Sequence, residues 1–153
     1  MNREDEFHEL QQAAEKLAIL AKKLSSDQKY TGFIEEDVSI INQLVCAEEM
    51  YRQRRKREKF FDNGLFGEPA WDILLDLFIS WGRGKSVSIS SACLAANVPT
   101  TTALRWIQAL LGQDLVRRSA DQSDARRVNV ALSENGYILM SEFLKNCILS
   151  SRR

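Results

Sequence analysis

Apolar side chains recur at helical spacing along the first sixty residues of the chain. Between residues 3 and 24 they lie three and four positions apart, which predicts one apolar edge along a helix. A second helix is predicted over about residues 34–60, with a wide apolar stripe. The segment 25–32 between them is polar and is predicted to be a loop.

The second of these predicted helices exposes more apolar surface than one small domain easily covers, which favours a homodimer. The residues expected at the dimer contact are Leu10, Leu17, Leu24, Ile34, Val38, Ile41 and Val45. The residues of a final helix expected to join them are Ile138, Phe143, Leu144 and Ile148. Helix 3–24 is covered either by another helix of its own chain or by a second copy, and the pattern leaves both open.

A third helix is predicted from Pro69 to Trp81, after a break at residues 62–64, because a proline suits the first position of a helix. The residues expected on its core face are Ala70, Ile73, Leu74, Leu77, Phe78 and Trp81. The period then shortens to that of a strand at Val87 and Ile89, and Ser90 is the expected N-cap of the next helix.

From Ser90 the chain has the spacing of a helix-turn-helix, with a tight turn at Asn97-Val98 and a second helix from about Pro99 to Leu111. The residues expected in the core are Cys93, Leu94 and Val98 on the first helix and Ala103, Ile107 and Leu110 on the second. The opposite side of the second helix carries Thr100, Thr101, Leu104, Arg105 and Gln108. Hydroxyls at a helix N-terminus suit phosphate oxygens, while Arg and Gln can address base edges in a major groove. The alternative is that the threonines only cap the helix and the arginine is an ordinary surface charge.

Two segments that alternate like strands, 115–119 and 127–132, flank a polar tip at 120–125. A hairpin directly after a helix-turn-helix is the wing of a winged helix. An arginine near such a tip can enter the narrow minor groove, and an aspartate two residues away can orient its guanidinium.

Charge is distributed unevenly, although the formal net charge is zero. Residues 1–50 contain 5 Lys/Arg against 11 Asp/Glu, and residues 51–153 contain 16 against 10. This asymmetry fits a later part that meets phosphate. A basic run over 52–59 is either a solvated face or a further phosphate contact.

The sequence offers no catalytic constellation, metal site or cofactor motif. The chain has one histidine, and the three cysteines, Cys46, Cys93 and Cys147, lack zinc or disulfide spacing, so we expect reduced thiols. No signal peptide or membrane span is predicted, which favours a cytoplasmic protein with no membrane partner.

Over roughly Leu65 to Leu144 the sequence resembles the MarR family of winged-helix regulators. The motifs that carry the resemblance are the helix 69–81, the turn Asn97-Val98, the join 110–116, the tip Asp124-Ala125-Arg126-Arg127 and the segment Val130 to Gly136, where Ser133 takes the place of an N-cap threonine. The resemblance implies that Arg126 is the minor-groove arginine and Asp124 its orienting partner. The residues expected to contact DNA are Thr100, Thr101, Thr102, Arg105, Gln108, Arg118, Asp124, Arg126 and Arg127. Both ends of the sequence depart from the family pattern. The resemblance therefore does not imply that this chain has the family's effector pocket.

The predicted fold is mainly α with a small β-hairpin wing. A helical dimerisation region (1–64) precedes a winged helix-turn-helix (65–132), and a C-terminal helix (133–153) is expected to pack on the dimerisation region. The predicted function is that of a sequence-specific regulator of transcription, not an enzyme, that binds double-stranded DNA as a homodimer. Two alternatives stay open: a winged-helix module that binds protein, and a repressor that senses a thiol oxidant or a small-molecule effector.

Overall fold

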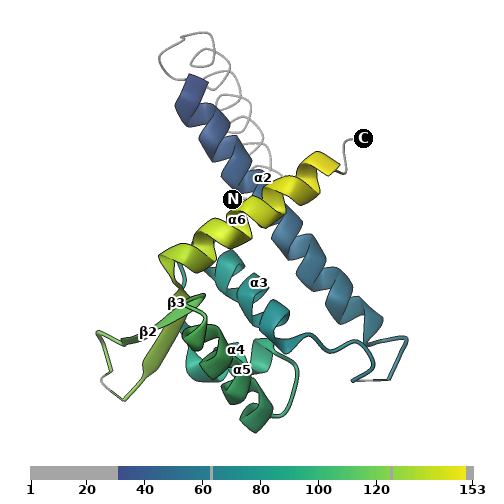
Figure 1. The fold of residues 1–153 in the computed structure, drawn as a ribbon, viewed down its shortest axis with the longest axis vertical. Coiled ribbons are helices and arrows are strands. Elements are labelled where there is room, and N and C mark those ends of the chain that lie inside the picture. The colour runs from purple at the N-terminus through teal and green to yellow at the C-terminus, as the bar shows by residue number, and fades with distance from the viewer. Residues whose placement is uncertain (1–30, 63, 125, 151–153) are drawn as a thin grey trace, which may run out of the picture. The chain divides into compact units, whose positions relative to one another are not determined.

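The computed structural model describes residues 31–62, 64–124 and 126–150, with side chains from residue 40 onward. The chain divides into two units, residues 1–40 and residues 41–153. The elements are α2 (Thr31–Arg57), α3 (Pro69–Gly82), β1 (Val87–Ser88), α4 (Ile89–Ala95), α5 (Thr100–Gly112), β2 (Val116–Ala120), β3 (Val128–Leu132) and α6 (Glu134–Ser150). In the second unit, Figure 1 shows the β2–β3 hairpin extending beside the α4–α5 pair, so the winged helix-turn-helix fold is confirmed.

Some sequence predictions for the first sixty residues fall outside what the structure describes, and one of them changes. The helix predicted over 3–24, with Leu10, Leu17 and Leu24, lies outside the described residues. Ile34 and Val38 lie in α2, in the part whose side chains are not described. Helix α2 begins at Thr31, so the end of the polar segment 25–32 is helical rather than a loop.

Helix α3 lies at the centre of the second unit, where it contacts α4, α5, β3 and α6. Ile73, Leu77 and Phe78 are buried as predicted, but Trp81 is 47% exposed. Leu75 and Ile79, which the predicted stripe omitted, are buried instead. Neighbours on several sides bury more of a helix than the single stripe that periodicity assumes.

The strand and cap before α4 differ from the prediction by one or two residues. Ile89 is the first residue of α4, and Ser88 is the N-cap, because its side-chain oxygen accepts the Ser91 N–H at 3.1 Å. The predicted cap at Ser90 is therefore wrong. The two residues of β1 pair with β3, which makes a three-stranded antiparallel sheet in the order β1-β3-β2.

The turn of the helix-turn-helix lies where the sequence placed it. Asn97 has a φ of 51°, in the left-handed region that Asn tolerates better than most residues, and α5 begins after Pro99. Cys93 is buried as predicted, whereas Leu94 is 82% exposed. Leu94 lies on the opposite side of α4 from the buried Ala92, so its predicted burial is wrong.

The wing joins α6 through a close contact at the base of the hairpin. Ser133 caps α6 as predicted: its Oγ accepts the Gly136 N–H at 2.9 Å and donates to the Asp114 carbonyl at 2.5 Å. The Ser133 N–H also donates to the Leu115 carbonyl at 3.1 Å. A Cβ at position 136 would overlap that same Leu115 oxygen, so only glycine fits there.

None of the helices within the described residues has both the length and the hydropathy that crossing a bilayer requires.

Candidate nucleic-acid interface

Helix α5 buries one side and exposes the other. Ala103, Ile107 and Leu110 are buried, as predicted from their spacing. The side chains that remain on the surface are Thr100, Thr101, Arg105 and Gln108, all exposed, and Thr102, which is half-buried. The sequence therefore identified the outward face of this helix correctly.

The hairpin presents its arginines to solvent. Val116 and Val130 anchor β2 and β3 in the core, and Arg118 pairs in register with Val130. Arg117 and Arg118 on β2 are exposed, as are Arg126 and Arg127 at the tip. Adjacent arginines on a strand point to opposite faces, so the hairpin offers positive charge on both sides.

Asp121 organises the wing tip, a role that the sequence analysis did not assign. Its Oδ1 accepts hydrogen bonds from the Ser123 Oγ at 2.5 Å and the Ser123 N–H at 2.8 Å, and its Oδ2 accepts one from the Asn129 Nδ2 at 3.0 Å. These donors, the Ser123 hydroxyl first, lower the pKa of Asp121 far below its usual range. An aspartate followed two residues later by serine at a turn is the local signal that could have revealed this role.

Asp124 contacts the backbone of the arginine that it was expected to orient. Its Oδ1 accepts the Arg126 N–H at 3.0 Å, and its carbonyl oxygen accepts the Arg127 N–H at 2.9 Å. The carboxylates of Asp121 and Asp124 thus fix the path of the chain at the tip, next to the arginines.

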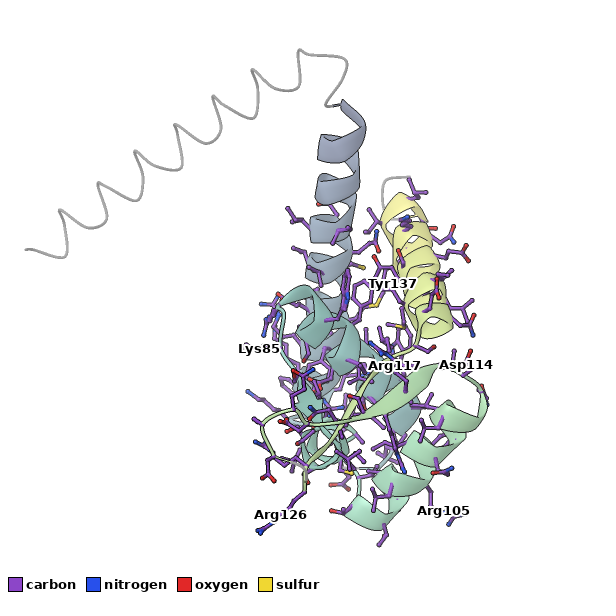
Figure 2. All side chains as sticks on the ribbon, turned by 90° about the vertical axis from the view of Figure 1, so that its left-hand side faces the viewer. Lys85, Arg105, Asp114, Arg117, Arg126 and Tyr137 are labelled. Carbon is purple, nitrogen blue, oxygen red and sulfur yellow. The ribbon has the colours of Figure 1, made fainter. Side chains whose placement is uncertain are left out.

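Helix α5 and the wing are linked by a side-chain hydrogen bond, and both reach the same end of the unit. The Arg118 Nη2 donates to the Gln108 Oε1 at 3.4 Å, which links β2 to α5. Figure 2 shows Arg105 on α5 and Arg126 at the wing tip both at the lower end of the view. Two arginines from different elements therefore lie at the same end of the winged helix.

Two arginines in the basic run at the end of α2, Arg54 and Arg55, differ from the sequence prediction. Arg54 is 9% exposed and forms ion pairs with Asp72 and Glu68. Arg55 pairs with Asp72 at 2.6 Å and with Glu58 at 3.0 Å. For these two arginines, both the solvated-face and the phosphate-contact predictions are wrong, because their guanidinium groups lie against carboxylates of the same chain.

The predicted dimer contacts that the structure describes lie on α2 and α6. Ile41 and Val45 are 58% and 61% exposed. On α6, Ile138 and Phe143 are also exposed, but Leu144 is fully buried in the core, so its expected part in a dimer contact is wrong.

Two thiols, those of Cys46 and Cys93, lie in surroundings that disfavour the thiolate. Burial raises the pKa of Cys93, and burial together with the nearby Cys147 raises the pKa of Cys46. Since the thiolate is the reactive species, these shifts oppose fast oxidation. Among the described residues, no three His, Cys, Asp or Glu side chains cluster as metal ligands.

No protein-family model matches the chain, and no curated protein matches it. Solved structures that are similar in fold include the S. aureus MepR–DNA complex, with 20% identity, a TM-score of 0.46 and coverage of 69% of this chain and 82% of that one. The adhesin competence repressor AdcR from Streptococcus pyogenes has 17% identity, a TM-score of 0.44 and coverage of 69% and 75%. The MarR C80S mutant from E. coli has 16% identity, a TM-score of 0.44 and coverage of 68% and 76%.

These neighbours are regulators of the MarR family, the family that the sequence resembles. Likeness at such low identity and TM-score is too distant to carry a function to this chain.

Proposed function

We propose that this protein binds double-stranded DNA and regulates transcription through its winged helix. The observation that carries the proposal is the presence of Arg105 and Arg126 at one end of the unit, from α5 and from the wing. A helix of this size fits the major groove of B-DNA, and an arginine on a hairpin fits the narrow minor groove beside it.

In the proposed complex, α5 lies in the major groove. The hydroxyls of Thr100, Thr101 and Thr102 and the N–H groups of the first turn bind backbone phosphate. Arg105 and Gln108 face the base edges, since both are exposed on the side opposite the buried stripe. The wing places Arg126 in the flanking minor groove, with the exposed residues Arg118 and Arg127 near phosphate.

We further propose that the protein acts as a homodimer on a palindromic site. The exposed apolar side chains of α2 and α6 support a self-complementary contact, because Ile41, Val45 and Leu149 are each more than half exposed. Two-fold symmetry then places the half-sites about one helical turn apart.

DNA binding is tested by fluorescence anisotropy with a labelled random-sequence duplex. The expected affinity is measurable at low salt and falls linearly on a plot of log affinity against log salt. Arg126→Ala should weaken binding roughly ten-fold. The matched control is Lys145→Ala, which removes one exposed positive charge from α6. No binding at low salt, or equal losses in both variants, would refute the proposal.

The dimer is tested by sedimentation velocity on the whole chain. Val45→Asp puts a charge into the proposed contact and should shift the protein toward the monomer. Lys56→Asp, at an exposed polar position of the same helix, should leave the oligomeric state unchanged. A wild-type protein that sediments as a monomer at all concentrations would exclude this part of the proposal.

A second candidate is a winged-helix module that binds another protein. The observation that favours it is the apolar surface of the helix-turn-helix, where Leu94, Leu104 and Trp106 are 82%, 40% and 42% exposed. A protein partner held by such side chains predicts binding that changes little with salt. DNA binding predicts a steep decrease, so the salt series separates the two.

A further inference from the structure

The outward face of α5 is almost free of charge. From Ile89 to Gly112, across α4, the turn and α5, Arg105 is the one charged residue. The exposed residues that share its side of α5 include hydroxyl, amide and aliphatic side chains, namely those of Thr101, Gln108 and Leu104. A surface of this chemistry has few donors that can form bidentate bonds with guanine, the commonest specific contact of arginine and lysine.

Leu104 is the apolar member of that face. It lies three residues after Thr101 and four before Gln108, so the three side chains share one side of the helix. Its side chain is 40% exposed, whereas Ile107 one turn later is fully buried. Packing within the unit therefore leaves Leu104 with apolar surface that a ligand can cover.

Base edges in the major groove differ in the features that such side chains recognise. Thymine presents a C5-methyl group, which apolar side chains contact, and adenine presents the N6 and N7 pair that Gln or Asn binds. Guanine presents O6 and N7, which suit arginine. The side chains of the α5 face therefore suit thymine through Leu104, adenine through Gln108 and a single guanine through Arg105.

The wing holds Gln108 in a position suited to this reading. The Arg118 Nη2 donates to the Gln108 Oε1 at 3.4 Å, which leaves the second lone pair of that oxygen and both amide hydrogens available. Binding adenine needs one acceptor and one donor, and the Gln108 amide supplies both.

We propose that α5 reads an A·T-rich half-site containing one G·C pair, with Leu104 against a thymine methyl, Gln108 on an adenine and Arg105 on the guanine. This inference rests on the proposed function, in which α5 lies in the major groove. Arg126 at the wing tip suits the same DNA, because A·T tracts have a narrow minor groove with strong negative potential.

The base composition is tested by selection from a random duplex library with the purified full chain. The expected half-site is A·T-rich with one invariant G·C pair, and Arg105→Ala should flatten the preference at that pair alone. Enrichment of half-sites with two or more neighbouring invariant G·C pairs overturns the proposal.

The methyl contact is tested without changing the protein, by synthesising the selected duplex with deoxyuridine in place of thymidine, one position at a time. Loss of the contacted methyl should weaken binding about four-fold. Leu104→Ala should lose a similar factor on the thymidine duplex and become insensitive to deoxyuridine. Leu94→Ala is the matched control, because Leu94 is an exposed leucine on α4, away from the α5 face, and it should retain the wild-type sensitivity.

The outcomes separate this inference from the proposed function. A protein that binds no duplex at low salt refutes both. A protein that binds duplex DNA with a steep salt dependence, but is indifferent to deoxyuridine at every position, keeps the proposed function and loses the thymine readout.

Discussion

Two arginine-rich segments of this chain have similar compositions and different environments. At the end of α2, Arg54 and Arg55 lie against Asp72, a carboxylate with a 2% exposed side chain. In the wing, the nearby carboxylates of Asp121 and Asp124 accept hydrogen bonds from backbone N–H groups. The wing arginines are therefore presented outward, whereas the α2 arginines hold two helices together. Counting charges along a sequence does not distinguish these two uses.

The largest effect on stability is expected from removing the charge of Asp72, the α3 carboxylate that pairs with the arginines of α2. Asp72→Asn leaves Arg54 buried without its main partner and should lower the free energy of unfolding by about 3–5 kcal/mol. Urea denaturation followed by circular dichroism measures this change. The control is Asp76→Asn one turn later on α3, where burial already raises the pKa of the carboxyl, so loss of its charge should cost little. Equal losses in the two variants would mean that the ion pair does not stabilise the fold.

Removing two arginines of the wing tip should weaken DNA binding and leave the free energy of unfolding nearly unchanged. Arg126→Ala combined with Arg127→Ala should reduce DNA affinity by ten-fold or more, on the order of 1–3 kcal/mol. The urea midpoint should stay within the range of ordinary surface substitutions, about 0.5 kcal/mol. A variant that unfolds more easily than the wild type would show that these arginines are structural, like those of α2.

The wing tip should keep its structure at acidic pH, because the pKa of Asp121 is lowered in the folded state. The contribution of this carboxylate is complete above the ordinary Asp pKa of about 3.9 and is lost as the pH falls from there through the lowered value. In a nuclear magnetic resonance titration, the Ser123 amide shift should therefore stay constant from pH 7 to about 4. A transition centred on the ordinary value would contradict the hydrogen bonds at the tip, and Asp121→Asn should change this shift at every pH.

The smallest effect is expected at the contact between wing and helix. Arg118→Ala removes a long, exposed hydrogen bond to Gln108 and should weaken DNA binding only about two-fold. The informative readout is selectivity: discrimination at the base pair read by Gln108 should decrease, while Arg118→Lys retains part of it. Unchanged discrimination in Arg118→Ala would show that the contact does not orient the amide.

Features set by neighbouring residues were predictable from the sequence. The Asn97 turn, the buried stripe of α5 and the Ser133 cap depend on residues within a few positions, and all three are confirmed. The outward face of the candidate site followed from the same local periodicity.

Features set by distant residues were not predictable in this way. Arg54 meets Asp72 across 18 positions, and the two residues of β1 form a strand only because β3 lies beside them. The exposure of Leu94 and of Trp81 likewise depends on where other elements end. Whether an arginine stabilises the fold or stays exposed to solvent is also not predictable from local sequence, because its ion-pair partner is far away in the sequence.

The junction of Ser133, Leu115 and Gly136 has a mechanical consequence. Because the first turn of α6 is hydrogen-bonded to the residues just before β2 and fits there with no spare space, we expect the hairpin and the helix to move together. Any tilt of α6 then acts as a lever, and the displacement is greatest at the distal end of the hairpin, where Arg126 lies.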